Sequence, residues 1–364
     1  MPTSNPDESN CTQGGFPVYA VKVSSVTHVQ LAVNFARNNN IRLVIKNTGH
    51  CYLGKSSGAG ALSIWMHNLK DITYYVYLGI PSYSGPAMKI GAGVTVREVY
   101  EAAHRNNLSA LGGICESVGY VGGYIAGGGH IPLSGLYDMA ADHVMALEVV
   151  TAGGHFITVS ADDNPDVYWA LRGGSSGSIG VVTSIIIRVH SKGPRHHFSL
   201  LIRYLRDRAY ACVLHGLGLY LRKRRRPQER RHIHVSGNRL LSRRNWEDEI
   251  KFDATFAVLR NQSEHERRRM GYHQAPRNRA AADNAVQSAF REVICFLVSG
   301  GALADPENLT PEQVKAASEE VRREIIAPFR EVAPEGEGGG AYSNEANVDE
   351  PMRREAFYGY GGWE

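Results

Sequence analysis

The sequence lacks the long apolar runs from which membrane-spanning helices are built. No stretch of its 364 residues approaches the ~18–20 consecutive apolar residues that a bilayer crossing requires. It also lacks the basic-then-apolar start of a secretory signal peptide, because residues 1–12 are polar. We therefore do not expect an integral membrane protein, and both the secretory route and the cytoplasm remain open as compartments.

Cysteine pairs of the metal-binding kind are missing as well. None of the five cysteines forms a Cys-x-x-Cys pair, so the sequence predicts no zinc site and no other metal centre. Four Asn-x-Ser/Thr triplets begin at Asn10, Asn107, Asn261 and Asn308. They would be glycosylation sites only in a secreted protein.

Neither extreme of composition applies to this chain. Its 43% hydrophobic and 21% charged residues are close to the globular norm, which excludes a fibrous or wholly disordered protein. The length allows two domains or one large one. The net charge of +4 is unevenly distributed, since residues 195–280 carry 19 Arg and two Lys against eight acidic residues.

The first half of the sequence has the pattern of a layered α/β structure. Apolar residues at helical spacing follow Ser25 and Thr95, two good N-cap residues. Short apolar runs bounded by turn residues indicate strands. The sequence predicts helices over 25–38, 96–106 and 166–171, and strands over 17–23, 41–45, 61–65, 144–151, 156–159 and 181–189.

Glycine is concentrated in three segments, 47–58, 112–130 and 172–180. Eight of the 18 residues from Gly112 to Gly129 are glycine, which disfavours a regular helix or strand. Small residues let backbone N–H groups approach a pyrophosphate or a large flat ligand. The alternatives are an ordinary solvated loop at 47–58 and a flexible linker at 112–130, although the linker fits poorly with the interleaved Val, Ile and Tyr. Neither a Walker A sequence nor a GxGxxG turn is present.

Three motifs in these segments make the chain similar to a known family. They are Lys46–His50 with Gly54, Ser56 and Ser57; Gly113–Cys115 through Gly127–His130; and Trp169–Gly174 through Gly180–Thr183. In order and spacing, residues 16–193 resemble the FAD-binding domain of the vanillyl-alcohol-oxidase/p-cresol-methylhydroxylase (PCMH) superfamily. Within it, the chain looks most like the fungal berberine-bridge-enzyme-like FAD-linked oxidoreductases.

The resemblance implies an α+β fold. A PCMH-type domain of two α/β subdomains would hold FAD, and an atypical, incomplete substrate-binding region would follow it. We expect a tail over 1–15, the FAD-binding domain over 16–193, an Arg-rich substrate-domain region over 194–330 and the family's C-terminal region over 331–364. A further family segment that returns to the flavin is expected to be missing after residue 364.

Many members of the family attach FAD covalently through a His and a Cys. The matching positions are His50 and Cys115, for which the alternatives are a polar loop histidine and a small buried thiol. Other positions that the motifs place on the cofactor could instead be plain turn glycines or core valines. They are Thr48, Gly49, Cys51, Gly54, Ser56, Ser57, Val118, Gly119, Gly122, Gly123, Gly128, His130, Val149 and Val182.

The resemblance also implies a reaction. A base would take a proton from a small organic substrate while hydride passes to the flavin, which O2 would then reoxidise. Tyr342 and Glu345 are the nearest candidates for that base by motif position. The expected activity is FAD-linked oxidation in secondary metabolism, for example in an alkaloid pathway such as chanoclavine formation.

The Arg-rich second half departs from the family pattern. Its basic runs include 222–226 and 267–269, and could be a tail for nucleic acid or a localisation signal. They could equally reflect an altered reading frame, a retained intron or a degenerated copy, which we favour, and a nucleic-acid partner is not expected. The alternative function is therefore a truncated or inactive FAD-binding protein whose basic insert binds polyanions.

Overall fold

The computed structural model describes about two thirds of the chain. The described residues are 13–80, 83–131, 134–174, 177–192, 239–242, 271–274, 283–291, 293–298, 310–337 and 339–359. Most of the Arg-rich region over 195–280, including its basic runs, lies outside these ranges.

The first unit is a small parallel sheet with one covering helix. Strands β1 (Tyr19–Lys22), β3 (Leu62–Trp65) and β2 (Leu43–Lys46) pair in parallel in that order. Helix α1 (Val26–Asn38) buries Val29, Ala32, Val33 and Ala36, which recur at helical spacing. The Ser25 hydroxyl accepts a hydrogen bond from the His28 amide at 3.4 Å and so caps the helix.

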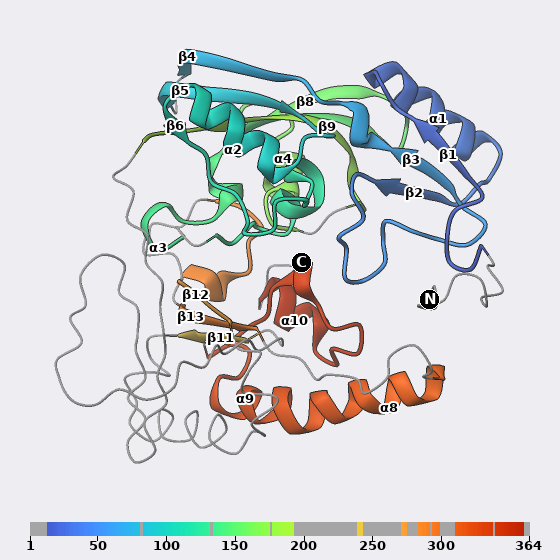
Figure 1. Cartoon of the computed structure of the whole chain (residues 1–364), viewed down its shortest axis with the longest axis vertical. Coiled ribbons are helices and arrows are strands. Elements are labelled where there is room, and N and C mark those ends of the chain that lie inside the picture. Colours follow the sequence, from blue (N-terminus) through green and yellow to red (C-terminus); the bar gives the residue numbers. More distant parts are fainter. Residues whose placement is uncertain are drawn as a thin grey trace.

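The second unit is a five-stranded antiparallel sheet (Figure 1). Its strand order is β4 (Ile72–Ile80), β5 (Tyr83–Gly91), β9 (Gly180–Arg188), β7 (Val144–Thr151) and β8 (Phe156–Ser160). The predicted strands over 144–151, 156–159 and 181–189 are confirmed to within a residue or two. No strand was predicted between residues 65 and 144, so β4 and β5 were not expected.

Two helices belong to this second unit. Helix α2 (Val96–Arg105) begins with a capping box, in which the Thr95 amide donates to the Glu98 carboxylate at 2.7 Å. Helix α4 (Pro165–Leu171) has proline in its first turn, where the missing N–H costs nothing. In Figure 1 both helices lie on the side of the sheet that faces the C-terminal elements. The apolar faces of both units join one buried core.

The glycine-rich segment crosses this core as irregular backbone. A short turn at 120–124 contains Gly122 at φ +91°, a left-handed conformation that side chains disfavour. Tyr120, Val121 and Ile125 of the segment are buried. The short strands β6 (Leu108–Ser109) and β10 (His190–Ser191) pair beside it, and α3 (Ser134–Tyr137) follows. Most of the interleaved apolar residues from Tyr120 onward are therefore core residues, as expected for a structural segment and not for a linker, whereas Ile114 is exposed.

The C-terminal part combines a small sheet with three helices. Strands β11 (Arg239–Ser242), β13 (Val293–Val298) and β12 (Gly271–Gln274) form an antiparallel sheet in that order. Helices α8 (Pro311–Val321), α9 (Ala327–Val332) and α10 (Arg353–Tyr358) follow. Figure 1 shows α8 and α9 at the far end of the molecule from the five-stranded sheet. No strand was predicted over 195–280, so β11 and β12 were not expected there.

A buried ion pair fastens the C-terminal part to the first half. The Arg291 guanidinium donates to both carboxylate oxygens of Asp142 at 2.6 and 2.9 Å, and the Asn284 amide donates to the same carboxylate at 2.6 Å. Burial alone would raise the pKa of Asp142, but the hydrogen bond and charge of Arg291 outweigh it and lower the pKa. The carboxylate therefore stays charged and holds residues 284–291 against the turn after α3.

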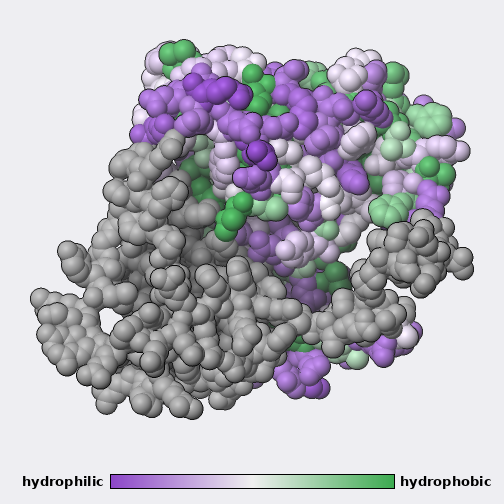
Figure 2. Space-filling model, viewed as in Figure 1, coloured by the Kyte–Doolittle hydropathy of each residue, from purple (hydrophilic) through white to green (hydrophobic). Residues whose placement is uncertain are grey.

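The surface of the first half is mainly polar in the view of Figure 2. Hydrophilic side chains cover most of the described elements on this face, and hydrophobic ones are scattered among them. Within the described residues, no helix is both long enough and apolar enough to cross a membrane.

Candidate functional site

The three glycine-bearing segments meet at one cavity of about 680 Å³. Residues 47–57 form one wall, much of 113–123 a second and much of 177–182 a third. A fourth wall comes from residues 342–345, which are more than 200 positions away from the second. The cavity is therefore built from the segments whose composition singled them out, together with a C-terminal segment.

The first wall is a loop that follows β2. Gly49 and Gly54 adopt φ values of +93° and +68°, where glycine is strongly favoured. The Gly54 amide donates to the Cys51 carbonyl at 3.1 Å, and the Ser57 amide donates to the Gly54 carbonyl at 3.0 Å, so the loop is a series of tight turns. All the residues that the sequence predicted here line the cavity, namely Thr48, Gly49, His50, Cys51, Gly54, Ser56 and Ser57.

The second wall packs directly against the first. A Cβ added at Gly119 would lie 2.2 Å from Nδ2 of Asn47, which only glycine avoids. The Gly119 amide donates to Oγ1 of Thr48 at 3.1 Å and joins the two loops. Of the predicted residues in this segment, Val118, Gly119, Gly122, Gly123 and His130 line the cavity. Gly128 does not, because it is buried beside Met139 and Val286.

The two predicted anchors lie on adjacent walls and share one neighbour. Nε2 of His50 is 2.9 Å from Oγ of Ser117, and Sγ of Cys115 is 3.6 Å from the same oxygen. His50 and Cys115 both line the cavity, and Cys115 is an exposed free thiol. The structure therefore brings a nucleophilic nitrogen and a nucleophilic sulfur to one place. Ser117 itself was not predicted.

The third wall belongs to the start of β9. Val181 and Val182 line the cavity, and Val182 pairs with Val149 of β7. A Cβ at Gly180 would lie 2.6 Å from Cγ1 of Val149, so glycine is needed for the close strand packing. Val149 itself is fully buried in the core behind this wall and does not line the cavity.

The fourth wall carries the two predicted catalytic candidates. The Tyr342 hydroxyl accepts hydrogen bonds from the Gly129 amide at 3.1 Å and from the Asn344 side-chain amide at 2.8 Å. Asn344 also donates to the Tyr124 carbonyl at 3.1 Å. These contacts fix residues 342–345 against the glycine-rich segment. Asn344 and Tyr124 were not predicted, because nothing in the sequence indicates a contact over such a separation.

The electrostatics of this wall separate the roles of its two acids. Burial, reinforced by the charge of Glu345, raises the pKa of Tyr342 above its usual range and keeps the hydroxyl protonated. One carboxylate oxygen of Glu345 lies 3.1 Å from Nε2 of His130. The other, Oε2, is buried and has no hydrogen-bond partner among the described residues. Such an oxygen in a cavity wall is available to a ligand.

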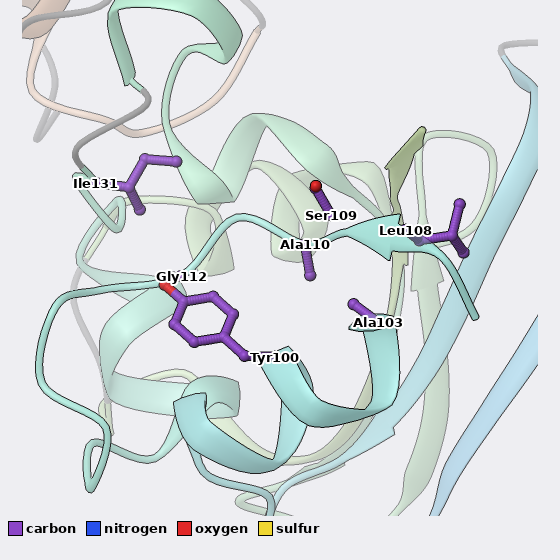
Figure 3. Close-up of a pocket in the computed structure, with 7 residues that line it drawn as sticks. All are labelled: Tyr100, Ala103, Leu108, Ser109, Ala110, Gly112 and Ile131. Atoms are coloured by element: carbon purple, nitrogen blue, oxygen red, sulfur yellow. The ribbon is translucent and has the colours of Figure 1, made fainter. Parts of the chain in front are cut away.

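A second cavity adjoins the first and is much smaller. Its volume is about 270 Å³, and Figure 3 shows the Tyr100 ring beside Gly112, with Ala103 and Ala110 facing them. The Tyr100 hydroxyl donates to the carbonyl of Gly113, which lines the large cavity. The small cavity is lined by Tyr100, Ala103, Leu108, Ser109, Ala110, Gly112 and Ile131, none of which is charged. The large cavity is therefore the candidate site.

The large cavity has the features that a dinucleotide with a flat ring requires. Its first wall presents turn amides and hydroxyls suited to a pyrophosphate. Its second wall has glycine at positions 119, 122 and 123, which would let a ring system lie close to the backbone. Its third wall is apolar. Among the described residues, no cluster of His, Cys, Asp or Glu could hold a metal ion.

Comparison with known proteins agrees with this geometry. Residues 17–160 match the family of FAD binding domains. The chain is 48% identical over 193 residues to the VAO-type flavoprotein oxidase VAO615 of Thermothelomyces thermophilus, an alignment that covers 53% of this chain and 33% of that protein. It is 49% identical over 180 residues to the FAD-linked oxidoreductase ZEB1 of Gibberella zeae, covering 50% and 32%. The chain thus spans about a third of the length of these curated relatives.

The fold comparison extends further along the chain. The crystal structure of the VAO-type flavoprotein MtVAO615 from Myceliophthora thermophila C1 superposes with a TM-score of 0.81 at 27% identity. It covers 99% of this chain and 78% of that one. The expected fold class and the resemblance over residues 16–193 are therefore confirmed. The proposed domain boundaries stay a prediction.

Proposed function

Because residues 17–160 form an FAD-binding domain shared with fungal FAD-linked oxidoreductases and VAO-type flavoproteins, we propose that this chain oxidises a small organic molecule with FAD. The observation that carries the proposal is the convergence of four walls on one cavity, with two nucleophilic side chains and one uncommitted carboxylate oxygen. FAD would supply the hydride acceptor, and the chain would supply binding, orientation and a proton acceptor.

Each wall of the cavity would contact a different part of FAD. The turn amides and hydroxyls of residues 48–57 would hold the pyrophosphate, and Val118, Gly119, Gly122 and Gly123 would pass along the flavin. Val182 would contact the ring system from the third wall. His50 and Cys115 would attach the flavin covalently, since they are the nucleophiles that the cavity brings together.

Glu345 is the better of the two candidates for the proton acceptor. Tyr342 already accepts two hydrogen bonds, and its pKa is raised by burial, so at neutral pH it is a neutral hydroxyl. The Oε2 atom of Glu345 is uncommitted, and His130 orients the carboxylate through Oε1. Glu345 would therefore accept a proton at Oε2, and Tyr342 would hold the wall in place.

Purified protein tests the proposal directly. We expect a yellow chain whose visible absorbance remains in the pellet after acid precipitation, and peptides carrying flavin at His50 and Cys115. Glu345→Gln should retain the flavin and lose the oxidation of substrate. Glu331→Gln, which lies outside the cavity, should retain both. A colourless chain that takes up no FAD on titration would refute the proposal.

The alternative function keeps a separate test. A truncated or inactive FAD-binding protein with a polyanion-binding insert would bind heparin in a salt-sensitive way and would not reduce its flavin with any substrate. The basic runs that motivate it lie outside the described residues. Reoxidation by O2, and a role in secondary metabolism such as alkaloid synthesis, also stay predictions.

A further inference from the structure

The turn that carries Cys115 is held rigidly against helix α2. The Val118 amide donates to the Cys115 carbonyl at 3.2 Å and closes the turn. At the start of α2, the Val96 amide donates to the Val118 carbonyl at 2.9 Å and the Arg97 amide donates to the Glu116 carbonyl at 3.1 Å. Two backbone hydrogen bonds to a helix therefore fix the position from which Ser117 projects.

The Ser117 hydroxyl lies between two nucleophiles from different walls. His50 follows β2 and Cys115 precedes the glycine-rich turn, yet Nε2 and Sγ are 2.9 and 3.6 Å from the same oxygen. A hydroxyl can accept one hydrogen bond while donating another. Two arrangements satisfy both contacts: either Nε2–H donates to Oγ and Oγ–H donates to the sulfur, or the thiol donates to Oγ and Oγ–H donates to Nε2.

The first arrangement favours the reactive form of each nucleophile. With hydrogen on Nε2, the imidazole carries its lone pair on Nδ1. A hydroxyl that donates to sulfur stabilises the thiolate that forms when the thiol gives up its proton, and the thiolate is the nucleophilic form of cysteine. We propose that Ser117 is a positioning residue that prepares His50 and Cys115 together for covalent attachment of FAD. This inference rests on the proposed function, because it requires that FAD binds in the cavity.

The atoms and electrons of the attachment reaction balance when O2 is the electron acceptor. At each anchor, an N–H or S–H bond and one C–H bond of the isoalloxazine break, and a C–N or C–S bond forms. Two protons and two electrons leave at each anchor, and O2 takes them up as H2O2. The protons that leave the anchors are those on Nε2 of His50 and on Sγ of Cys115, and both groups contact Ser117.

The test measures flavin attached to each anchor and not turnover. Protein from riboflavin-limited cells is mixed with FAD in air, and samples taken over time are precipitated with acid and digested. The masses of the peptides containing residues 50 and 115 are then measured by mass spectrometry. Ser117→Ala should slow attachment at both anchors about tenfold, the rate equivalent of one lost hydrogen bond. Ser117→Thr, which keeps the hydroxyl, should restore most of it.

A matched variant controls for damage to the turn. Glu116 precedes Ser117, and its carboxylate faces Arg97 at 3.5 Å, so Glu116→Gln should attach flavin at the wild-type rate. Equal attachment rates in Ser117→Ala and wild type would overturn the inference. So would a loss confined to one anchor, because the hydroxyl contacts both.

Failure of the inference is separable from failure of the proposed function. A variant with both His50→Ala and Cys115→Ala reports reversible FAD binding alone, measured by quenching of flavin fluorescence. If that variant and wild type both bind no FAD, the proposed function fails and the inference with it. If both bind FAD and the wild type attaches it regardless of Ser117, only the inference fails.

Discussion

Replacing Gly119 by alanine tests how the two glycine-bearing walls fit together. The added Cβ would lie 2.2 Å from Nδ2 and 2.9 Å from Cγ of Asn47, distances that no real contact shows. Asn47 cannot simply rotate away, because Nδ2 donates to the Ala92 carbonyl at 2.8 Å and Oδ1 lies 3.1 Å from Nδ1 of His67. Either the side chain leaves both partners or the two loops separate.

Both responses are costly for stability. Each lost hydrogen bond removes about 1 kcal/mol of net stability. Forcing an extra methyl group into a packed contact costs a further ~1–3 kcal/mol. We therefore expect Gly119→Ala to lower the free energy of unfolding by about 3 kcal/mol and to weaken FAD binding, because both loops line the cavity.

Urea unfolding of the FAD-free chain is the appropriate assay, since bound cofactor would add its own stabilisation. Gly113→Ala is the matched control, because its added Cβ would only reach ordinary contact with Cε2 of Tyr124 at 3.5 Å. It should change stability by less than about 1 kcal/mol. In a chain that already carries Asn47→Ala, the additional cost of Gly119→Ala should fall sharply.

Two results would refute this reasoning. One is a Gly119→Ala midpoint equal to that of Gly113→Ala, which would mean that the loops do not pack as described. The other is an unchanged cost of Gly119→Ala in the Asn47→Ala background, which would place the strain at another neighbour.

Two further predictions concern pH and the buried ion pair. Burial, and then the charge of Arg188, lower the pKa of His143 to about 3, whereas the unfolded value is about 6.5. The unfolded chain therefore binds a proton first as the pH falls, and the free energy of unfolding should decrease by about 1.4 kcal/mol per pH unit between these values. His143→Gln should flatten that slope in urea titrations. An unchanged slope would contradict the lowered pKa of His143. Asp142→Asn leaves the charge of Arg291 buried without its partner and should cost about 3–5 kcal/mol at neutral pH. Because the pKa of Asp142 is lowered, this cost should shrink as the pH falls below ~4, and a cost that stays constant in thermal scans would argue against the ion pair.

The sequence predicted the first half of the fold closely because its elements are locally encoded. The apolar spacing after Ser25 gives α1 within its observed bounds, and the apolar run at 144–151 is β7 itself. The cofactor-site prediction depended on the family motifs, in which glycines such as Gly49 and Gly122 adopt φ values that other residues disfavour.

The remaining features depend on contacts that local patterns do not reveal. Gly129 and Tyr342 are 213 residues apart, and their hydrogen bond exists only in the folded chain. Ser117 is an unremarkable turn residue until His50 is placed beside it. The strands β11 and β12 are four residues each within Arg-rich sequence, too short for alternation to indicate a sheet.

The contribution of Tyr342 and Glu345 to the cavity has a consequence for biosynthesis. A growing chain can form the parallel sheet and the five-stranded sheet of the first half long before these residues are made. The Gly129 amide then lacks the hydroxyl that it meets in the finished protein. Retention of the flavin should therefore be a late event, after the ribosome has passed Glu345. A stalled or prematurely terminated chain would expose the glycine-rich backbone and become a substrate for chaperones and proteases instead of a flavoprotein.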